Sequence, residues 1–278
     1  MISASILADS LSPSGHRLTT MELHFPRFLL AQLNKHSSLR SCAQSSRAVP
    51  VAKLAEKATY TPARWGANRR GMVPGALLDD ASANHAQLEW QAARAQALES
   101  ADALDSRGVH KQWANRLLEP FSYASVVATG TEWELFFRLR LAHDAQDEMQ
   151  ELARAMRDAM DASGPRELRA GEWHLPYHRP ELDADVETSD LPLVCAARCA
   201  RVSYDTHTGE RSPAADLALA ARLVSEKHLT PLEMTAMPME HGGGDWYGAY
   251  RGWMSYRHRI AALEGRMVPT VTWRETEG

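Results

Sequence analysis

The sequence predicts an α+β protein that is dominated by helices and folds as a single domain. A strand-like alternation of apolar residues, two long helical patterns and the lack of tandem repeats lead to this prediction. The chain has 278 residues, of which 44% are hydrophobic and 24% are charged. Such a length and composition are typical of a soluble globular protein that can bury a sizeable core.

The first predicted element is a strand. Residues 17–25 place Met21, Leu23 and Phe25 in alternation, as in a half-buried strand. Pro26 can occupy the first position of a helix, so residues 27–36 are predicted to form a short helix. Residues 50–84 are interrupted by prolines and glycines, which predicts a long ordered loop with a short helix.

Two longer helices are expected in the middle of the chain. Residues 87–107 are rich in alanine and follow a helical pattern. Residues 144–160 are predicted to form a helix with one buried stripe, made of Ala145, Met149, Leu152 and Met156. The Ser-Gly-Pro sequence at residues 163–165 then predicts the end of this helix.

The last third of the chain is expected to begin with a connector. Residues 164–192 are rich in proline, aspartate and glutamate, which predicts an irregular segment on the surface. Residues 193–204 (LVCAARCARVSY) are apolar enough to be buried. Ser212 can cap a helix whose first residue is Pro213 and which extends to about Lys227.

Charge and composition argue against several classes of protein. The net charge of −4 gives no basic face for nucleic acid. No apolar run approaches the roughly 20 residues that cross a bilayer, and the N-terminus lacks the pattern of a secretory signal. The three cysteines, Cys42, Cys195 and Cys199, are too few for a disulfide framework and favour a reducing cytoplasm. They also lack the spacing of a metal site, so no metal is expected.

Three clusters of polar residues are candidates for chemistry. The first runs from Lys35 and His36 to Ser45 and Arg47, whose cations and hydroxyl could bind a phosphate. Its alternative interpretation is a solvated loop. In the second cluster, arginines stand on both sides of the apolar residues 121–130, and a buried arginine requires an anionic partner. Either a ligand or an internal glutamate can satisfy them; the residues are Arg116, Arg138 and Arg140, with Glu119, Glu132 and Glu134 nearby.

The third cluster lies near the C-terminus. It consists of residues 200–204 (ARVSY), a predicted helix, and residues 228–233 (HLTPLE). A turn at Pro231 could present Thr230 and Glu233 together. Physical reasoning from the residues alone assigns no specific chemistry to this cluster.

Taken together, the three clusters resemble the sequence blocks of the flavin-dependent thymidylate synthases. The ARVSY and HLTPLE segments are similar to the first block of that family. Residues 32–47 resemble a degraded form of its signature, R-Q-x-x-R-H-R-x7-S-x-R, and residues 115–120 (NRLLEP) with residues 136–146 resemble its last block. The resemblance covers nearly the whole chain. It implies a helix-rich α+β fold with a small, mainly antiparallel sheet.

The order of these blocks differs from the family. Its members begin with the ARVSY block, whereas in this chain that block comes last. Residues 251–260 (RGWMSYRHRI) also resemble the lead-in to the signature. We therefore predict a circularly permuted single domain, because permutation is tolerated where native termini lie close together. Its parts are the signature and arginine blocks in residues 17–163, the connector in 164–192 and the ARVSY block in 193–278.

The resemblance implies a function and a set of site residues. Members methylate dUMP to dTMP with FAD as cofactor, NADPH as reductant and methylenetetrahydrofolate as carbon donor, in a homotetramer with sites at subunit interfaces. The implied catalytic residues are Arg140, His228 and Ser45. The implied cofactor-binding residues are His36, Ser203, Thr230, Glu233, Arg257, His258 and Arg259, with His36 and the 257–259 triplet as rivals for the flavin. The implied substrate-binding residues are Gln32, Gln44, Ser45, Arg47, Arg116 and Arg140. A cytoplasmic location, in a bacterium or a phage-infected host, would suit such an enzyme.

Several positions depart from the family pattern. Lys35 and Ser37 replace two arginines, whose planar forks they cannot reproduce. Ala43, Leu135 and Met234 stand where an acidic residue, an asparagine and a histidine are common. These departures leave open the methylation or hydroxymethylation of another pyrimidine nucleotide such as dCMP, or a nucleotide-binding relative without activity.

Two further alternatives come from outside the family. A nucleic-acid binding module could use residues 256–259 and 45–47 as phosphate contacts, although the acidic net charge argues against it. A cysteine-dependent nucleotide methyltransferase would need Cys42 as its nucleophile, and no convincing activating base lies nearby in the sequence.

Overall fold

The computed structural model describes residues 1–207, 209, 212–239 and 245–263. The predicted ARVSY block therefore extends beyond the described residues at its C-terminal end. The strands are β1 (Ser3–Leu11), β2 (Arg17–Pro26), β3 (Leu39–Ala43), β4 (Tyr123–Gly130), β5 (Arg166–Glu167), β6 (Ala236–Pro238), β7 (Trp246–Tyr247), β8 (Tyr250–Arg251) and β9 (Trp253–Ser255). The α-helices are α1 (Leu30–Leu33), α2 (Val51–Ala55), α3 (Asp80–Ser106), α4 (Lys111–Ala114), α5 (Trp133–Arg140), α6 (Asp147–Asp161), α7 (Leu191–Arg201), α8 (Pro213–Ser225) and α9 (Tyr256–Leu263). Short 3-10 helices are η1 (Arg27–Leu29), η2 (Asn115–Phe121), η3 (Val202–Tyr204) and η4 (Thr230–Glu233).

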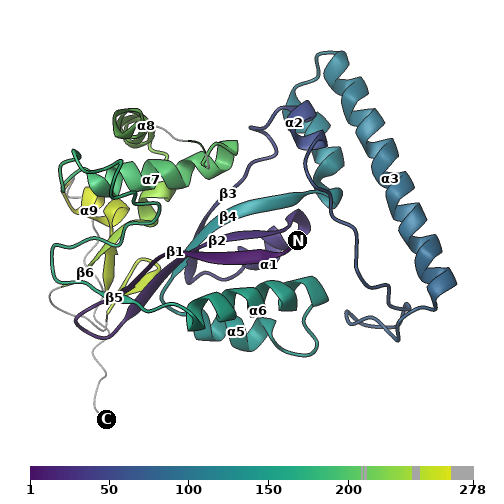
Figure 1. Ribbon diagram of the computed structural model, residues 1–278, viewed down its shortest axis with the longest axis horizontal. Helices are drawn as coiled ribbons and strands as arrows, with labels where there is room; N and C mark the ends of the chain where they lie inside the picture. The colour runs from purple at the N-terminus through teal and green to yellow at the C-terminus, as the bar shows by residue number, and fades with distance from the viewer. Residues whose placement is uncertain (208, 210–211, 240–244, 264–278) are drawn as a thin grey trace, which may run out of the picture.

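A five-stranded sheet lies at the centre of the structure (Figure 1). Its strand order is β3-β4-β2-β1-β5, and every neighbouring pair is antiparallel except β1 and β5. Two short antiparallel pairs, β6–β9 and β7–β8, lie beyond it. The predicted strand over residues 17–25 is confirmed as β2. The predicted α+β class, rich in helix with a small and mainly antiparallel sheet, is also confirmed.

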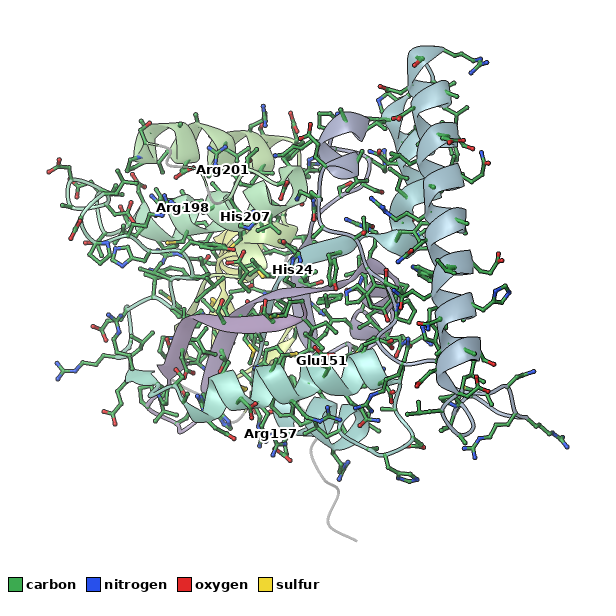
Figure 2. All side chains as sticks on the ribbon, turned by 45° about the vertical axis from the view of Figure 1, so that its right-hand side comes forward. His24, Glu151, Arg157, Arg198, Arg201 and His207 are labelled. Atoms are coloured by element: carbon green, nitrogen blue, oxygen red, sulfur yellow. The ribbon has the colours of Figure 1, made fainter. Side chains whose placement is uncertain are left out.

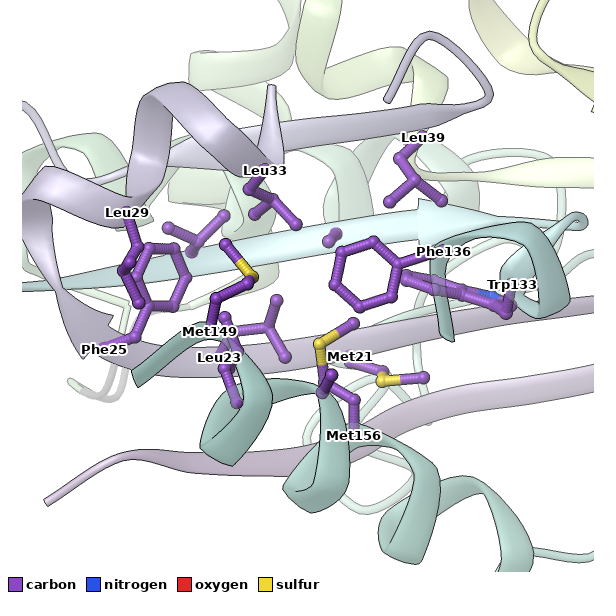
Figure 3. Close-up of a cluster of buried hydrophobic side chains, with 14 of the residues drawn as sticks. Met21, Leu23, Phe25, Leu29, Leu33, Leu39, Trp133, Phe136, Met149 and Met156 are labelled. Carbon is purple, nitrogen blue, oxygen red and sulfur yellow. The ribbon is translucent and has the colours of Figure 1, made fainter. Parts of the chain in front are cut away.

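One face of the sheet carries the main hydrophobic core (Figure 3). Because side chains alternate along a strand, Met21, Leu23 and Phe25 of β2 all point to this face. Helices α5 and α6 cover them. The predicted helical stripe is confirmed for three of its members, Met149, Leu152 and Met156, which are fully buried. Ala145 precedes the helix, which starts at Asp147.

The opposite face of the sheet packs against the C-terminal part of the chain. Val127 of β4 and Cys42 of β3 meet Cys199 of α7 and Val202 of η3 in a second core. Residues 193–204, expected to be buried, thus cover this face. Figure 2 shows the resulting layers, with Glu151 and Arg157 of α6 on one side of the sheet and Arg198 and Arg201 of α7 on the other.

Helix α3 stands beside these layers, at the edge of the molecule (Figure 1). It starts earlier than the predicted residue 87 because the Asp79 side chain caps it, accepting a hydrogen bond from Ser82 N at 2.8 Å. Its C-terminal half packs on a small core that includes Ala101, Leu54 and Leu118. Although α3 has 27 residues, no helix in the described part of the chain combines the length and apolar character needed to cross a membrane.

The structure differs from the sequence prediction at several elements. The sequence predicted no strand over β4 because residues 126–130 are buried on both faces, so the apolar and polar alternation of a half-buried strand is missing there. Strand β1 was also not expected. The helix predicted over residues 27–36 ends at Leu33 and begins with the 3-10 turn η1. In contrast, the Ser212 cap is confirmed, and α8 runs from Pro213 to Ser225.

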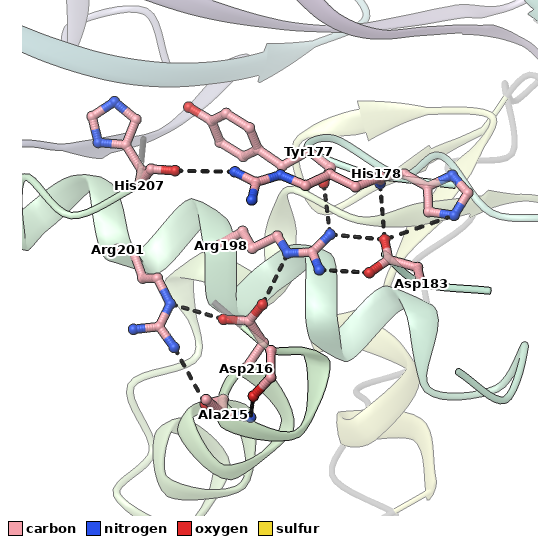
Figure 4. Close-up of polar contacts among 10 residues, drawn as sticks. Tyr177, His178, Asp183, Arg198, Arg201, His207, Ala215 and Asp216 are labelled. Carbon is pink, nitrogen blue, oxygen red and sulfur yellow. Dashed lines mark hydrogen bonds and ion pairs between the residues drawn. The ribbon is translucent and has the colours of Figure 1, made fainter. Parts of the chain in front are cut away.

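A buried ion-pair cluster around Arg198 joins three segments of the C-terminal part (Figure 4). The Arg198 guanidinium donates to both carboxylate oxygens of Asp183, at 2.8 and 2.6 Å, to Asp216 at 2.9 Å and to the Tyr177 carbonyl at 2.8 Å. Arg201 binds the second oxygen of Asp216 at 2.8 Å. Burial raises the pKa of Asp183, but the hydrogen bonds from Arg198, the bond from Arg179 N and the charges of Arg198 and His178 together lower it overall. The cluster therefore ties residues 177–183, α7 and α8 together.

A buried histidine fixes the connector to the sheet. His174 is fully buried, and its ring nitrogens bind the hydroxyls of Ser10 at 2.9 Å and Thr20 at 2.7 Å. The Thr20 hydroxyl continues to Thr129 at 2.7 Å, so the ring contacts a chain of groups on β1, β2 and β4. Burial lowers the pKa of His174 to about 3, and the ring is neutral at pH 7. The sequence predicts a connector that lies on the surface. The burial of His174 shows that part of the connector is instead inside the protein.

Replacing Arg198 with methionine is expected to lower the free energy of unfolding by about 3–5 kcal/mol, because two carboxylates then remain buried with too few partners. Chemical denaturation at neutral pH measures this loss. The matched control is Arg64→Met, since Arg64 is exposed and lies 3.9 Å from the Asp147 carboxylate; its loss should stay within about 1 kcal/mol. Equal, small losses in both variants would show that the Arg198 cluster contributes little stability.

The His174 ring predicts an acid-dependent loss of stability. Its folded pKa lies below the ordinary value of 6.5, so the neutral ring stabilises the fold fully above that pH, and the stabilisation falls as the pH drops toward about 3. Between pH 4 and 6 the wild-type protein should therefore take up about one more proton on unfolding than His174→Gln. The slope of the unfolding free energy against pH gives this number. Exposed His85 supplies the control variant, His85→Gln. Identical slopes for wild type and His174→Gln would contradict the prediction.

Candidate functional site

A cavity of about 860 Å³ opens between the start of η1, the loop after β3 and the helices α3 and η2. Its wall has an aromatic and apolar part and a part rich in hydroxyl and guanidinium groups. The lining residues are Arg27, Phe28, Leu30, Ala31, Asn34, Ala43, Gln44, Ser45, Ser46, Arg47, Trp90, Arg116, Glu119 and Pro120. Both the volume and the mixed lining are typical of a small-molecule site.

The loop after β3 is held in place from three sides. Gln44 N extends the sheet by donating to the Ser125 carbonyl at 2.8 Å. Ser45 N donates to the Ser203 carbonyl at 3.0 Å, and this contact joins the loop to the ARVSY segment. The Asn115 amide of η2 donates to the Ser46 carbonyl at 2.6 Å. The backbone of residues 44–46 is therefore fixed before any ligand binds.

Four predicted substrate-binding residues meet in this cavity: Gln44, Ser45, Arg47 and Arg116. The Ser45 hydroxyl accepts from Arg47 N at 3.2 Å. The Arg47 guanidinium itself has no hydrogen-bond or ion-pair partner among the described residues. For Arg116 the sequence left two alternatives, a ligand or an internal glutamate. The structure shows the glutamate, because the Arg116 guanidinium lies 2.9 and 3.1 Å from the two Glu119 oxygens. The Ser46 hydroxyl also donates to Glu119, at 2.6 Å.

Arg27 is a cavity residue that the sequence did not single out. It directly follows Pro26, within the short helix predicted over residues 27–36. Its Nη1 donates to the Gln44 carbonyl at 3.0 Å, whereas Nε and Nη2 are buried without a partner. Burial lowers its pKa; the charge of Glu119 partly opposes this effect, and the charge of Arg116 adds to it. Nothing in the local sequence distinguishes this arginine from a surface one.

Three other predicted residues, Gln32, His36 and Arg140, form a separate cluster beside α5. Arg140 Nε donates to His36 Nε2 at 2.9 Å, and Arg140 Nη2 donates to the Gln32 carbonyl at 3.3 Å. Burial, together with the Arg140 charge, lowers the pKa of His36 and favours the neutral ring that accepts this bond. None of the three is among the residues that line the cavity.

The third predicted group centres on the Glu233 carboxylate. Arg257 Nη1 lies 2.8 Å from one of its oxygens, and Arg40 Nε lies 3.3 Å from the other. The Glu233 side chain is only 8% exposed, and Tyr250 donates to its backbone carbonyl at 2.8 Å. Glu233 and Arg257 are therefore brought together as predicted residues, while Arg40 of β3 was missed. Thr230 begins η4 and is exposed.

The remaining predicted residues do not join this group. His258 Nδ1 pairs with the Ser255 hydroxyl at 2.7 Å, and burial lowers its pKa. Arg259 stacks over Trp173, with its guanidinium carbon 5.6 Å from the ring centroid. His228 is exposed and its Nδ1 lies 3.5 Å from Glu226. None of these three side chains hydrogen-bonds to the Glu233 carboxylate, although the charges of Arg257 and Arg40 add to the lowering of the His258 pKa.

The cysteines are buried and do not line the cavity. Burial raises the pKa of the Cys42 thiol to about 12, so it is protonated at neutral pH. Cys42 packs with Cys199 in the core behind the sheet, and Cys195 is likewise buried. This environment argues against Cys42 as a nucleophile and confirms that Cys195 and Cys199 serve as apolar core residues.

A second recess, of about 340 Å³, lies between strands β1, β2 and β4 and residues 205–207, and it has the opposite charge character. His24 and His207 both line it and lie close together in Figure 2. His207 binds the Glu22 carboxylate at 2.7 Å, and this hydrogen bond is the main cause that lowers the pKa of Glu22. Two carboxylates and no arginine line this recess, so an anionic ligand fits the larger cavity better. Among the described residues, no group of His, Cys, Asp and Glu side chains could hold a metal ion.

Comparison with known proteins gives one family and several solved structures. The family model of the thymidylate synthase complementing protein matches residues 2–166. No curated protein matches the sequence. The UMP/dUMP methylase PolB from Streptomyces cacaoi, bound with 5-Br dUMP, has a TM-score of 0.48 and 17% identity, over 58% of this chain and 90% of that one. Thymidylate synthase X from Helicobacter pylori, with FAD and dUMP, has a TM-score of 0.36 and 20% identity, over 51% of this chain and 67% of that one.

The match to the family model spans the predicted signature and arginine blocks and ends before the ARVSY segment. It therefore includes the 44–47 loop, Arg116 and the other N-terminal walls of the cavity. Since the matched residues make up more than half of the sequence, this chain belongs to the family of the thymidylate synthase complementing protein.

Proposed function

We propose that this protein methylates dUMP to dTMP, with FAD as cofactor, NADPH as reductant and methylenetetrahydrofolate as carbon donor. The main observation in support is that residues from two of the family's sequence blocks line one cavity. These residues are Gln44, Ser45, Arg47 and Arg116. Thymidylate synthase X from Helicobacter pylori was solved with FAD and dUMP. The family match supports the same two ligands for this chain.

The dUMP phosphate would bind between Arg47, Arg116 and the Ser45 hydroxyl. Guanidinium groups form strong, charge-assisted hydrogen bonds to phosphate oxygens. Arg47 is free to do so, and Arg116 would exchange its bond to Glu119 for one to the phosphate. Glu119 would keep the Ser46 hydroxyl as a donor after this exchange.

The uracil ring would face the apolar side of the cavity. Phe28, Trp90 and Pro120 provide flat apolar surface there, on which an aromatic base can stack. Gln44 Nε2 is buried without a partner and could donate to a uracil carbonyl. The cavity thus offers both a cationic end and an end suited to a planar base.

The proposed catalytic roles of Arg140 and His228 require a second subunit. Arg140, with Gln32 and His36, lies outside the cavity of its own chain, and His228 is exposed. In the proposed homotetramer, a neighbouring subunit would bring these side chains to the cavity. A guanidinium near the uracil carbonyls would stabilise the negative charge that develops as C5 attacks the carbon donor.

The residues around Glu233 fit an anionic cofactor such as FAD. Two guanidinium groups share this one carboxylate, which leaves an excess positive charge, and both remain partly exposed (Arg40 34%, Arg257 44%). Arg257 and Arg40 would hold the FAD diphosphate, and the hydroxyls of Ser203 and Thr230 would donate further hydrogen bonds to the cofactor. Bound FAD would supply the electrons that convert the transferred carbon to a methyl group. Of the 257–259 triplet, Arg257 is the member whose position suits this role.

We also propose that the chain is one permuted domain. Support comes from two contacts between its N-terminal and C-terminal blocks, Ser45 N to the Ser203 carbonyl and Arg40 to Glu233. These contacts place the ARVSY and HLTPLE segments beside the signature loop although they come last in the sequence. All three cysteines are free, which agrees with the proposed cytoplasmic location.

A related pyrimidine nucleotide is the second candidate substrate. Ala43 lines the cavity at the position where the family commonly has an acidic residue. Loss of that carboxylate changes the hydrogen-bonding groups near the base, so dCMP, methylated or hydroxymethylated, is the alternative to dUMP. The assays below therefore include both nucleotides.

The absorption spectrum of the purified protein with added FAD tests the proposed reaction. We expect a bound flavin that NADPH bleaches under anaerobic conditions, and that dUMP with methylenetetrahydrofolate reoxidises with formation of dTMP. Turnover with dCMP in place of dUMP would support the second candidate. Absence of flavin binding at micromolar FAD would contradict the flavin-dependent mechanism. The protein would then be a nucleotide-binding relative without this activity.

Arg47→Met tests the phosphate end of the cavity. Because the guanidinium has no partner among the residues that the structure describes, its removal should leave the melting temperature unchanged while it weakens dUMP binding roughly 10- to 100-fold. Isothermal titration calorimetry measures both affinities. Exposed Arg222 of α8 provides the control variant, Arg222→Met, which should bind dUMP like the wild type. Unchanged dUMP affinity in Arg47→Met would place the phosphate elsewhere.

A further inference from the structure

The arrangement of Arg27 is unusual for a buried charge. The residue is 8% exposed and lines the cavity, yet no carboxylate among the described residues forms an ion pair with it; the charge of Glu119 acts on it only without direct contact. Only Nη1 has a partner, the Gln44 carbonyl, while Nε and Nη2 are buried without one. A buried cation in this state costs free energy, and burial accordingly lowers its pKa.

The same chain shows what a purely structural buried arginine looks like. The Arg198 side chain is 3% exposed and pairs with two carboxylates, Asp183 and Asp216. Its nitrogens are satisfied within the protein, and none of them is orphaned. Arg27 is also buried, at 8% exposure, but without this compensation. Within the described part of the chain, no carboxylate hydrogen-bonds to the Arg27 guanidinium, and only the charge of the nearby Glu119 partly offsets its own.

The unpaired groups at the cavity wall are all of one kind. Nε and Nη2 of Arg27 and Nε2 of Gln44 are donors, and no buried acceptor on a cavity-lining side chain lacks a partner. The described lining residues carry three positive charges, on Arg27, Arg47 and Arg116, and one negative charge on Glu119. The net charge of +2 matches a phosphate monoester, which carries about −1.5 to −2 near pH 7.

We propose that Arg27 is a specificity-determining residue, whose unpaired charge beneath the Gln44 backbone makes the cavity select a doubly charged phosphate monoester over the uncharged nucleoside. The inference rests on the proposed function for the identity of the nucleotide, dUMP, but its charge argument needs only an anion in the cavity. In the poorly screened wall, the Arg27 charge acts on the phosphate more strongly than a solvent-exposed arginine would. Arg27 thus adds a third cation to the two that the family's sequence blocks contribute.

Two substitutions separate charge from packing. Arg27→Met keeps the length of the side chain and removes its charge, whereas Arg27→Lys keeps the charge. We expect Arg27→Met to weaken the binding of dUMP and of inorganic phosphate at least about tenfold, with deoxyuridine affinity unchanged. Arg27→Lys should restore most of the preference for dUMP over deoxyuridine. Arg222→Met serves again as the control.

Thermal stability without ligand gives the second readout. Because Arg27→Met removes an unpaired buried charge, its melting temperature should be no lower than that of the wild type, the lost bond to the Gln44 carbonyl offsetting part of the gain. Saturating dUMP should raise the melting temperature of the wild type more than that of Arg27→Met. A merely structural arginine would lower the melting temperature on removal and leave the preference for the phosphate unchanged.

The outcomes separate this inference from the proposed function. Wild-type affinity for dUMP in Arg27→Met overturns the inference, as does an equal loss in Arg27→Met and Arg27→Lys, which would indicate packing. If the wild type binds phosphate through Arg27 but neither dUMP nor FAD, the inference stands and the proposed function fails. If the wild type binds neither dUMP nor phosphate, the cavity is not an anion site and both fail.

Discussion

The buried Arg198 cluster is the interaction on which the rest of the C-terminal architecture depends. Its two carboxylates come from the connector and from α8, so one guanidinium sets the position of α7 between them. Helix α7 continues into η3, whose Ser203 carbonyl receives the backbone N–H of Ser45. A charge network deep in one layer thereby fixes the loop that forms a wall of the cavity on the other side of β3. The network itself contacts no part of that cavity.

Two buried arginines of this protein differ in how the free-energy cost of burying their charge is offset. Arg198 is neutralised from within and gives rigidity to the scaffold. Arg27 has no ion-pair partner in the described part of the chain and lies at the wall of a cavity, where an anion from solution would provide the missing partner in the proposed site. Such a division is familiar in enzymes, whose binding sites are often less stable than the framework around them because they are complementary to something that is absent. Arg40 and Arg257 are an intermediate case, since the single negative charge of Glu233 balances only one of their two positive charges.

The elements that the sequence predicted best are those with one buried face. Strand β2 and helix α6 carry clear periods of 2 and 3.6 residues, whereas β4 is buried on both faces and shows no alternation. For the site, the family blocks led to Ser45, Arg47 and Arg116, which lie close to one another in the cavity. Arg27 and Arg40 were not predicted as site residues. The role of Arg40 depends on its contact with Glu233, which is distant in the sequence. That of Arg27 depends on buried nitrogens that lack a partner. No local pattern records either property.

Strand β3 has a further consequence for how the protein can change. Leu39 and Ala43 face the core under α5, while Arg40 and Cys42 face Glu233 and the α7 layer. Since successive side chains alternate, insertion or deletion of one residue here would turn both sets to the wrong layer. It would also displace the loop that follows directly at residue 44. Substitutions at individual positions of β3 are therefore easier to accommodate than a change in its length. The number of residues from Leu39 to the cavity loop at residue 44 must stay constant.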